Sequence, residues 1–185
     1  MTTNTVLEVI KSRRSIRKYL PEQVKDAELK AILEAGAYAP SAHNDQSWHF
    51  TVVRNKDLLD QISARAKEIM AGQGTDWVRA MGTNKLFHVF YHAPAVIVVS
   101  MRSDALSPLV DCCAAIENML LAAESMDIGT CWIGLARYYF ALKDELAPLE
   151  IPPGYEPCYA VALGYKGQRP SRALPRKKGA VNYID

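Results

Sequence analysis

The protein has 185 residues, of which 49% are hydrophobic and 23% are charged, and its formal net charge is +2. This length and composition are typical of one globular domain with a substantial core, so we expect a single domain over residues 1–185. No apolar run approaches the roughly 18 residues of a membrane-spanning helix. The first charges follow a short helix rather than precede a hydrophobic segment, so we expect neither a membrane partner nor a secretory signal.

The cysteines lie in apolar segments, and no C-x-x-C spacing occurs among them. This pattern argues against a zinc site and against a disulfide framework, and it indicates reduced core thiols in a cytoplasmic protein. The residues concerned are Cys112, Cys113, Cys131 and Cys158.

Positive charge is concentrated near the two ends of the chain, and no acid lies between Glu156 and Asp185. The basic clusters are Lys11, Arg13, Arg14, Arg17 and Lys18 near the start, and Lys166, Arg169, Arg172, Arg176, Lys177 and Lys178 near the end. Such clusters are compatible with solvated surface, with a nucleic-acid footprint or with convergence on one small phosphate. No aromatic platform is interleaved with them, so we do not expect a nucleic-acid partner.

The first half of the chain predicts helices over residues 5–12, 27–37 and 57–70, and a strand over residues 48–54. In the first helix, Val6, Val9 and Ile10 are expected to face inward, and Asp26 is expected to cap the second helix. Residues 40–47 form a predicted loop of small hydrogen-bonding side chains. Such loops often hold ligands, although many are only turns.

In the second half, residues 71–85 are predicted as a loop, followed by a short helical piece that ends near residue 90. The apolar run at residues 95–99 predicts a central strand. A helix over residues 109–126 carries a narrow polar stripe, and its many small residues favour close packing against another helix or a second subunit. Gly129 is interpreted as the stop of this helix. The remaining predictions are strands over 130–135, 158–165 and 180–184 and a helix over 138–146, which together give a sheet with helices on both faces.

No side chain stands out as a nucleophile, acid, base or metal ligand. The dinucleotide, P-loop and serine-hydrolase motifs are absent. His88 and His92 have a spacing that suits metal binding on a helix, but Val89 stands where a metalloprotease has its glutamate. Cys112 and Cys113 lie in the most apolar helix, which disfavours a catalytic thiol. We therefore expect no metal and no catalytic side chain, and we expect a bound cofactor to carry the chemistry.

The segment Arg13-Arg14-Ser15-Ile16-Arg17 is the strongest candidate for a cofactor contact. Alternate residues of an extended segment point the same way, so Arg13, Ser15 and Arg17 can line one wall while Ile16 packs inward. The arginine side chain offers fork-shaped donors that suit phosphate and carbonyl-like edges of heterocycles.

Motifs along nearly the whole chain resemble the nitroreductase family of FMN-dependent oxidoreductases. They are R-R-S-I-R, P-S-A-H-N-D-Q-S-W-H-F, A-A-E-S-M-D-I-G-T-C-W-I-G-L, A-L-G-Y and P-R-K-K, in this order. The resemblance implies an α+β fold with a central, mostly antiparallel sheet flanked by helices. It also implies a homodimer built around the long helix, with a C-terminal extension that embraces the partner and two FMN sites at the interface.

The resemblance also implies cofactor-binding residues in several segments. The phosphate, ribityl and pyrimidine contacts correspond to Arg13, Arg14, Ser15 and Arg17, and the phosphate-binding pair of the tail corresponds to Arg176 and Lys178. The polar loop corresponds to Pro40, Ser41 and Asn44, and the backbone along the flavin ring to Trp132, Ile133 and Gly134. Asn84 and Lys85 correspond to a mid-chain contact. The chain departs from the family pattern at Ser47, where proline is common, and at Ile133, where some members have an acid, and it lacks the inserted helical excursion of longer members.

The predicted function is a two-step oxidoreductase. NADH or NADPH reduces FMN, and a small-molecule acceptor such as a nitroaromatic or a quinone then takes the electrons. The alternative from another class is a flavin-binding redox sensor without NAD(P)H turnover.

Overall fold

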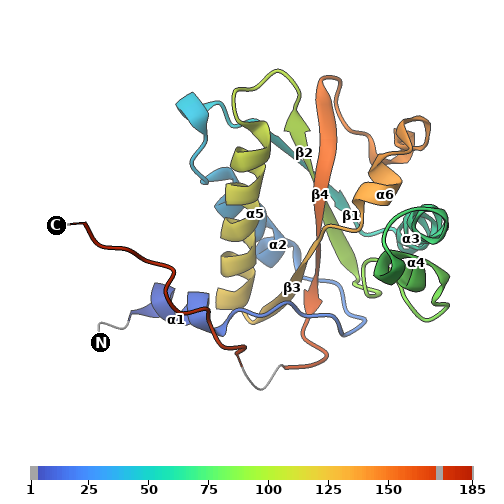
Figure 1. Cartoon of the computed structure of the whole chain (residues 1–185). Helices are drawn as coiled ribbons and strands as arrows, with labels where there is room; N and C mark the ends of the chain where they lie inside the picture. Colours follow the sequence, from blue (N-terminus) through green and yellow to red (C-terminus); the bar gives the residue numbers. More distant parts are fainter. Residues whose placement is uncertain (1–3, 170–172, 185) are drawn as a thin grey trace.

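The computed structural model describes residues 4–169 and 173–184. Its centre is a four-stranded antiparallel sheet with the strand order β1-β2-β4-β3 (Figure 1). The strands are β1 (Trp48–Val53), β2 (Ala95–Arg102), β3 (Ile128–Ile133) and β4 (Tyr155–Tyr165). Because β2 and β4 are the inner strands, the apolar run predicted as a central strand is confirmed, and β3 is left at one edge.

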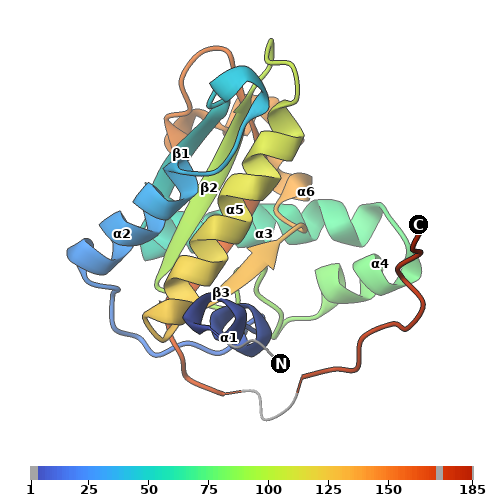
Figure 2. The ribbon, with the colours of Figure 1, turned by 90° about the vertical axis from the view of Figure 1, so that its left-hand side faces the viewer.

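Helices cover both faces of the sheet, and the predicted α+β fold with a flanked antiparallel sheet is confirmed. Alternate strand residues enter the two cores: Val96 and Val98 face one side, and Ile97 and Val99 face the other. Figure 2 looks onto the layer of α2 (Asp26–Ala37) and α5 (Pro108–Ser125). The opposite layer consists of α3 (Lys56–Gly72), α4 (Asp76–Thr83) and α6 (Arg137–Phe140).

Helix α1 (Thr5–Ser12) forms as predicted, but its apolar side is not buried by this chain. Val6 is 63% exposed and Ile10 is 46% exposed, so the prediction that they face inward is wrong for the single chain. The helix therefore has the predicted apolar spacing, but this side is exposed in the single chain.

Several boundaries differ from the sequence-based expectation. Helix α4 lies inside the predicted loop, and the predicted helical piece before residue 90 consists of turns. The predicted helix over 138–146 is broken at Leu142 (φ −87°, ψ 70°) and continues as the 3-10 turns η2 (Lys143–Glu145) and η3 (Ala147–Leu149). No strand forms within residues 180–184. Asp26 is the first residue of α2, and Lys25 precedes it as the N-cap.

Gly129 does not stop α5. The helix ends at Ser125, the chain turns at Asp127 (φ 60°), and Gly129 lies inside β3. A Cβ atom at Gly129 would lie 2.9 Å from Cγ2 of Ile16, so glycine is needed here for the N-terminal segment to approach the strand. Among the described residues, no helix is long and apolar enough to cross a membrane.

Candidate functional site

The segment around Ser15 runs along the outer edge of β3. Ser15 pairs with Thr130 in a parallel bridge, and the backbone N–H of Ile16 donates to the Thr130 carbonyl at 2.8 Å. The Ile16 side chain is buried, as predicted. The Tyr19 hydroxyl donates to the Ile16 carbonyl at 2.7 Å and holds the segment from the other side. We call residues 13–17 the N-terminal strap.

The arginines of the strap have different surroundings. The Nε atom of Arg13 lies 3.9 Å from Oε1 of Glu117 on α5. Nη1 of Arg14 donates to the carbonyls of Lys11 and Arg13, both at 2.7 Å, and so satisfies acceptors left free at the end of α1. The Arg17 guanidinium is exposed and lies over the Tyr91 ring at 5.6 Å from its centroid.

The strap pairs with β3 in the parallel sense at Thr130. The outer side of β3 after Thr130 therefore adjoins the surface formed by the strap. The Ser15–Thr130 bridge is the last pairing on this edge within the described residues, and the backbone from Trp132 onward has no strand on its outer side. The Trp132 ring packs edge-on against the Tyr159 ring, and the ring centres are 5.2 Å apart. A Cβ atom added to Gly134 would meet nothing within 4 Å, so a flat group has room to approach this backbone.

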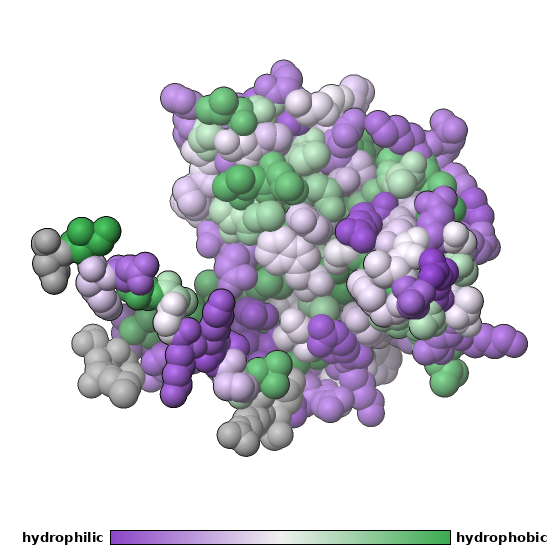
Figure 3. Space-filling model, viewed as in Figure 1, coloured by the Kyte–Doolittle hydropathy of each residue, from purple (hydrophilic) through white to green (hydrophobic). Residues whose placement is uncertain are grey.

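A cleft of about 570 Å³ opens next to Gly134. Its lining includes Leu135 and Arg137 after β3, Trp77 from α4 and Leu109 from α5. Figure 3 shows the molecule from the side of α5, α4 and α6. Sequence reasoning missed Trp77 and Arg137, because neither lies in a recognisable motif and 59 intervening residues separate them.

The loop that carries Pro40, Ser41 and Asn44 lies at the opposite end of α5 from α1 (Figure 1). It is fixed there by Asp111 in the first turn of α5, whose carboxylate accepts from the Ala42 N–H at 3.1 Å and from the Ser47 hydroxyl at 2.8 Å. An 18-residue helix is about 27 Å long. A single chain therefore does not bring this loop to the end of α5 where the strap lies.

The C-terminal basic cluster divides into two parts. Lys166 pairs with Glu124 at 2.8 Å, and Arg169 pairs with Asp127, so these two cations are tied to the end of α5 and the turn after it. Arg176 and Lys178 are exposed in an extended segment that leaves the body of the domain (Figure 2). Neither forms an ion pair within the described residues. Asn84 and Lys85 are exposed after α4.

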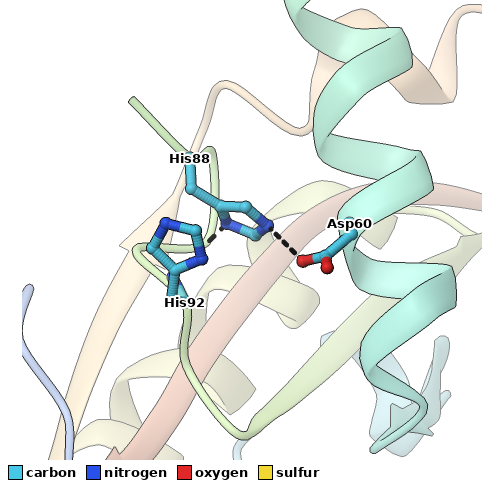
Figure 4. A group of neighbouring side chains, drawn as sticks. All are labelled: Asp60, His88 and His92. Atoms are coloured by element: carbon cyan, nitrogen blue, oxygen red, sulfur yellow. Dashed lines mark hydrogen bonds and ion pairs between the residues drawn. The ribbon is translucent and has the colours of Figure 1, made fainter. Parts of the chain in front are cut away.

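His88 and His92 lie on turns rather than on a helical face, and Asp60 of α3 joins them (Figure 4). The centres of the His88 and His92 rings are 4.2 Å apart. Nε2 of His88 lies 3.2 Å from a carboxylate oxygen of Asp60. Nδ1 of His88 accepts the Phe90 N–H at 3.1 Å, so the proton of the neutral ring is on Nε2 and points to Asp60. Burial lowers the pKa of His88 to about 4, which keeps the ring neutral. In this tautomer both ring nitrogens are engaged, and the cluster stabilises the turn.

The comparisons with known proteins agree with this architecture. The model of the Nitroreductase family matches residues 10–165. The chain belongs to the nitroreductase family. The resemblance predicted from the motifs is thereby confirmed.

Two solved nitroreductases with bound FMN are similar to this family member over whole chains. The protein from Bacteroides fragilis NCTC 9343 is 37% identical, with 99% of this chain and 100% of that chain covered and a TM-score of 0.86. The protein from Desulfitobacterium hafniense DCB-2 is 30% identical, with both chains covered completely and a TM-score of 0.88. An NADPH-flavin oxidoreductase of Vibrio harveyi is 30% identical over 172 residues, which is 90% of this chain and 68% of that protein.

Proposed function

We propose that this nitroreductase-family protein is an FMN-dependent oxidoreductase that uses NADH or NADPH to reduce electron-poor acceptors such as nitroaromatics and quinones. The observation that carries the proposal is the outer edge of β3 beyond Thr130, which pairs with no strand in the described structure and leads to open space beside Gly134, with the cationic strap next to it. FMN in the two solved relatives and NADPH in the name of the Vibrio relative support the cofactor and the electron donor. Bound FMN would supply the redox chemistry that neither substrate can provide alone, namely hydride acceptance from the nicotinamide and electron donation to the acceptor.

The residues of the strap and of β3 fit the two parts of this cofactor. Arg13, Arg14 and Ser15 hold the phosphate and ribityl groups, because a flavin phosphate needs several charged donors. Arg17 would supply a cation for the pyrimidine edge of the ring, where negative charge increases on reduction. Backbone groups of Trp132, Ile133 and Gly134 hydrogen-bond to the ring edge. No side-chain acid or base is required for hydride transfer, which agrees with the lack of a catalytic constellation.

We further propose that the site is completed by a second copy of the chain. The loop with Pro40, Ser41 and Asn44 comes from the partner, and the tail with Arg176 and Lys178 embraces the dimer and reaches a phosphate. This arrangement accounts for the separation of these groups within one chain. It also covers apolar side chains that are exposed on α1, α5 and the tail: Val6, Ile10, Val110, Leu174, Val181, Tyr183 and Ile184. Figure 3 shows an apolar patch over the upper part of α5. The free cysteines fit a cytoplasmic protein.

The deciding experiment combines spectroscopy with an anaerobic titration. The purified protein should be yellow, release FMN on heating and bleach on addition of NADH or NADPH. A protein that stays colourless in the presence of FMN refutes the proposal. A yellow protein that neither nucleotide bleaches would instead be a flavin-binding sensor.

The phosphate assignment is tested by FMN affinity. Arg13→Ala and Arg176→Ala should each weaken FMN binding about tenfold, because each removes a charge-assisted contact. Lys143→Ala is the matched control, since Lys143 is an exposed cation paired with Glu156. Unchanged FMN affinity in both arginine variants contradicts the assignment. Analytical ultracentrifugation should give twice the chain mass of 20.6 kDa, and a monomer contradicts the shared site.

A further inference from the structure

We propose that the cleft beside Gly134 selects aromatic acceptors that carry a carboxylate, and that Arg137 is the residue that binds this carboxylate. The inference rests on the proposed function, because the cleft adjoins the edge of β3 to which that function assigns the FMN ring. It concerns the preference among acceptors, which the family assignment leaves open.

The walls of the cleft are largely apolar and aromatic. Trp77 is 58% exposed on α4, Leu109 is 44% exposed at the start of α5, and Tyr159 lies on the strand next to β3. A tryptophan left this exposed at the mouth of a cleft offers a large flat surface for another ring. The volume of about 570 Å³ includes the space beside Gly134 that the proposed function assigns to the flavin ring, so the ring and an acceptor would share this cleft. These walls therefore suit a planar aromatic compound.

Among the described residues that line the cleft, Arg137 is the only charged one. Its Nη2 atom donates to the Tyr138 hydroxyl at 3.2 Å, and its guanidinium lies 5.0 Å from the centre of the Tyr138 ring. Within residues 4–169 and 173–184, no carboxylate lies in ion-pair distance of Arg137, whereas nearby Arg79 and Lys143 both have acidic partners. A guanidinium has five N–H donors, so most of them remain free for a ligand carboxylate.

The structure also holds Arg137 and Trp77 on adjoining elements. Gly74, which precedes α4, has a φ of 100°, and a Cβ atom there would lie 3.2 Å from the Tyr138 hydroxyl. The approach to α4 therefore packs directly against the side chain that orients Arg137. A cation at the rim of an aromatic cleft discriminates in favour of a ring that carries a negative charge.

An anion at Arg137 could also be a phosphate of the nicotinamide nucleotide, and the experiment separates the two sources. Binding of 4-nitrobenzoate and of nitrobenzene to the oxidised, FMN-loaded protein is measured by calorimetry, without any electron donor. The variants are Arg137→Gln, Arg137→Lys and the control Lys143→Gln, which removes an exposed charge outside the cleft. The kcat/KM values for both acceptors and the KM for NADH and NADPH are measured in the same set.

We expect Arg137→Gln to weaken 4-nitrobenzoate binding about tenfold and to leave nitrobenzene within about twofold. Arg137→Lys should retain much of the preference, and Lys143→Gln should match the parent. The inference is overturned if Arg137→Gln affects both acceptors equally, or if it raises the KM for a nucleotide and leaves the 4-nitrobenzoate affinity unchanged. Bleaching by NAD(P)H is measured separately. A protein that bleaches normally but shows no charge preference refutes only this inference, whereas failure to bleach refutes the proposed function.

Discussion

Asp111 is the residue whose replacement should reveal most about how the loop at residues 41–47 is held. Its carboxylate is 3% exposed and accepts the Ala42 N–H at 3.1 Å and the Ser47 hydroxyl at 2.8 Å. Ser47 is fully buried, so its hydroxyl has no access to water when the acceptor is removed. Asp111 also lies in the first turn of α5, where a negative charge stabilises the helix dipole.

These contacts set the expected loss of stability. A hydrogen bond to a charged group contributes about 1.5–3 kcal/mol, and an unsatisfied buried donor costs a similar amount. Allowing for relaxation of the half-buried Ala42, we expect Asp111→Ala to lower the free energy of unfolding by about 3–4 kcal/mol. Asp111→Asn should lower it by about 2–3 kcal/mol, because the amide keeps one acceptor oxygen but presents N–H donors to the other partner. Either loss is a large part of the typical stability of a domain, about 5–15 kcal/mol.

The measurement is urea unfolding followed by circular dichroism on the apoprotein. The matched control is Asp57→Asn, because Asp57 lies in the first turn of α3, is exposed and makes no side-chain hydrogen bond in the described structure. Its loss should be about 0.5 kcal/mol, which is the dipole contribution alone. A double variant with Ser47→Ala should lose less than the sum of the single variants, since the two residues share one bond. The reasoning fails if Asp111→Asn costs no more than Asp57→Asn.

Three further changes test other parts of the structure. The pKa of His88 is about 4 in the folded protein and 6.5 in an ordinary histidine. As the pH decreases, the unfolded chain therefore binds this proton before the folded protein does. Stability should therefore fall by up to about 3 kcal/mol as pH decreases from about 6.5 to about 4, and urea midpoints for His88→Gln should lose much of this dependence. Gly82→Ala places a Cβ atom 2.5 Å from the Ala71 backbone nitrogen, so α4 must move away from α3. This should lower the free energy of unfolding by about 1–3 kcal/mol, which is measured as a lower Tm. Lys166→Met leaves Glu124 unpaired and largely buried, which should cost about 3 kcal/mol in urea unfolding, and adding Glu124→Gln should restore most of it.

The sequence predicts those helices and strands whose hydrophobic pattern lies wholly within the segment. The run before Ser100 is apolar at every position, and it becomes the inner strand β2 with both faces buried. Helix α4 was missed because Gly72, Gly74 and Gly82 suggest a loop, although Gly82 is there so that α4 can approach α3. The apolar side of α1 was recognised, but Val6 and Ile10 stay exposed in the single chain, and the pattern within the helix does not show what they pack against.

Some parts of the candidate site could likewise be predicted from the sequence, and others could not. The strap was predicted to place Ile16 inward, and Ile16 is buried. Its pairing with Thr130 was not predicted, because a short local pattern does not identify a partner far away in the sequence. Ser47 stands where the resemblance led us to expect proline, and in the structure its hydroxyl is the buried partner of Asp111. The cleft residues Trp77 and Arg137 could not be predicted, since only the three-dimensional fold brings α4 and the segment after β3 to the same cleft.

The open side of β3 has a consequence for handling the protein. Backbone N–H and C=O groups that lack a neighbouring strand can accept a strand from another molecule, which is the usual beginning of sheet-mediated aggregation. The strap protects the early part of this strand but not the part near Trp132. A planar ligand seated there also shields the bare backbone, so preparations stripped of their flavin should precipitate sooner than loaded ones.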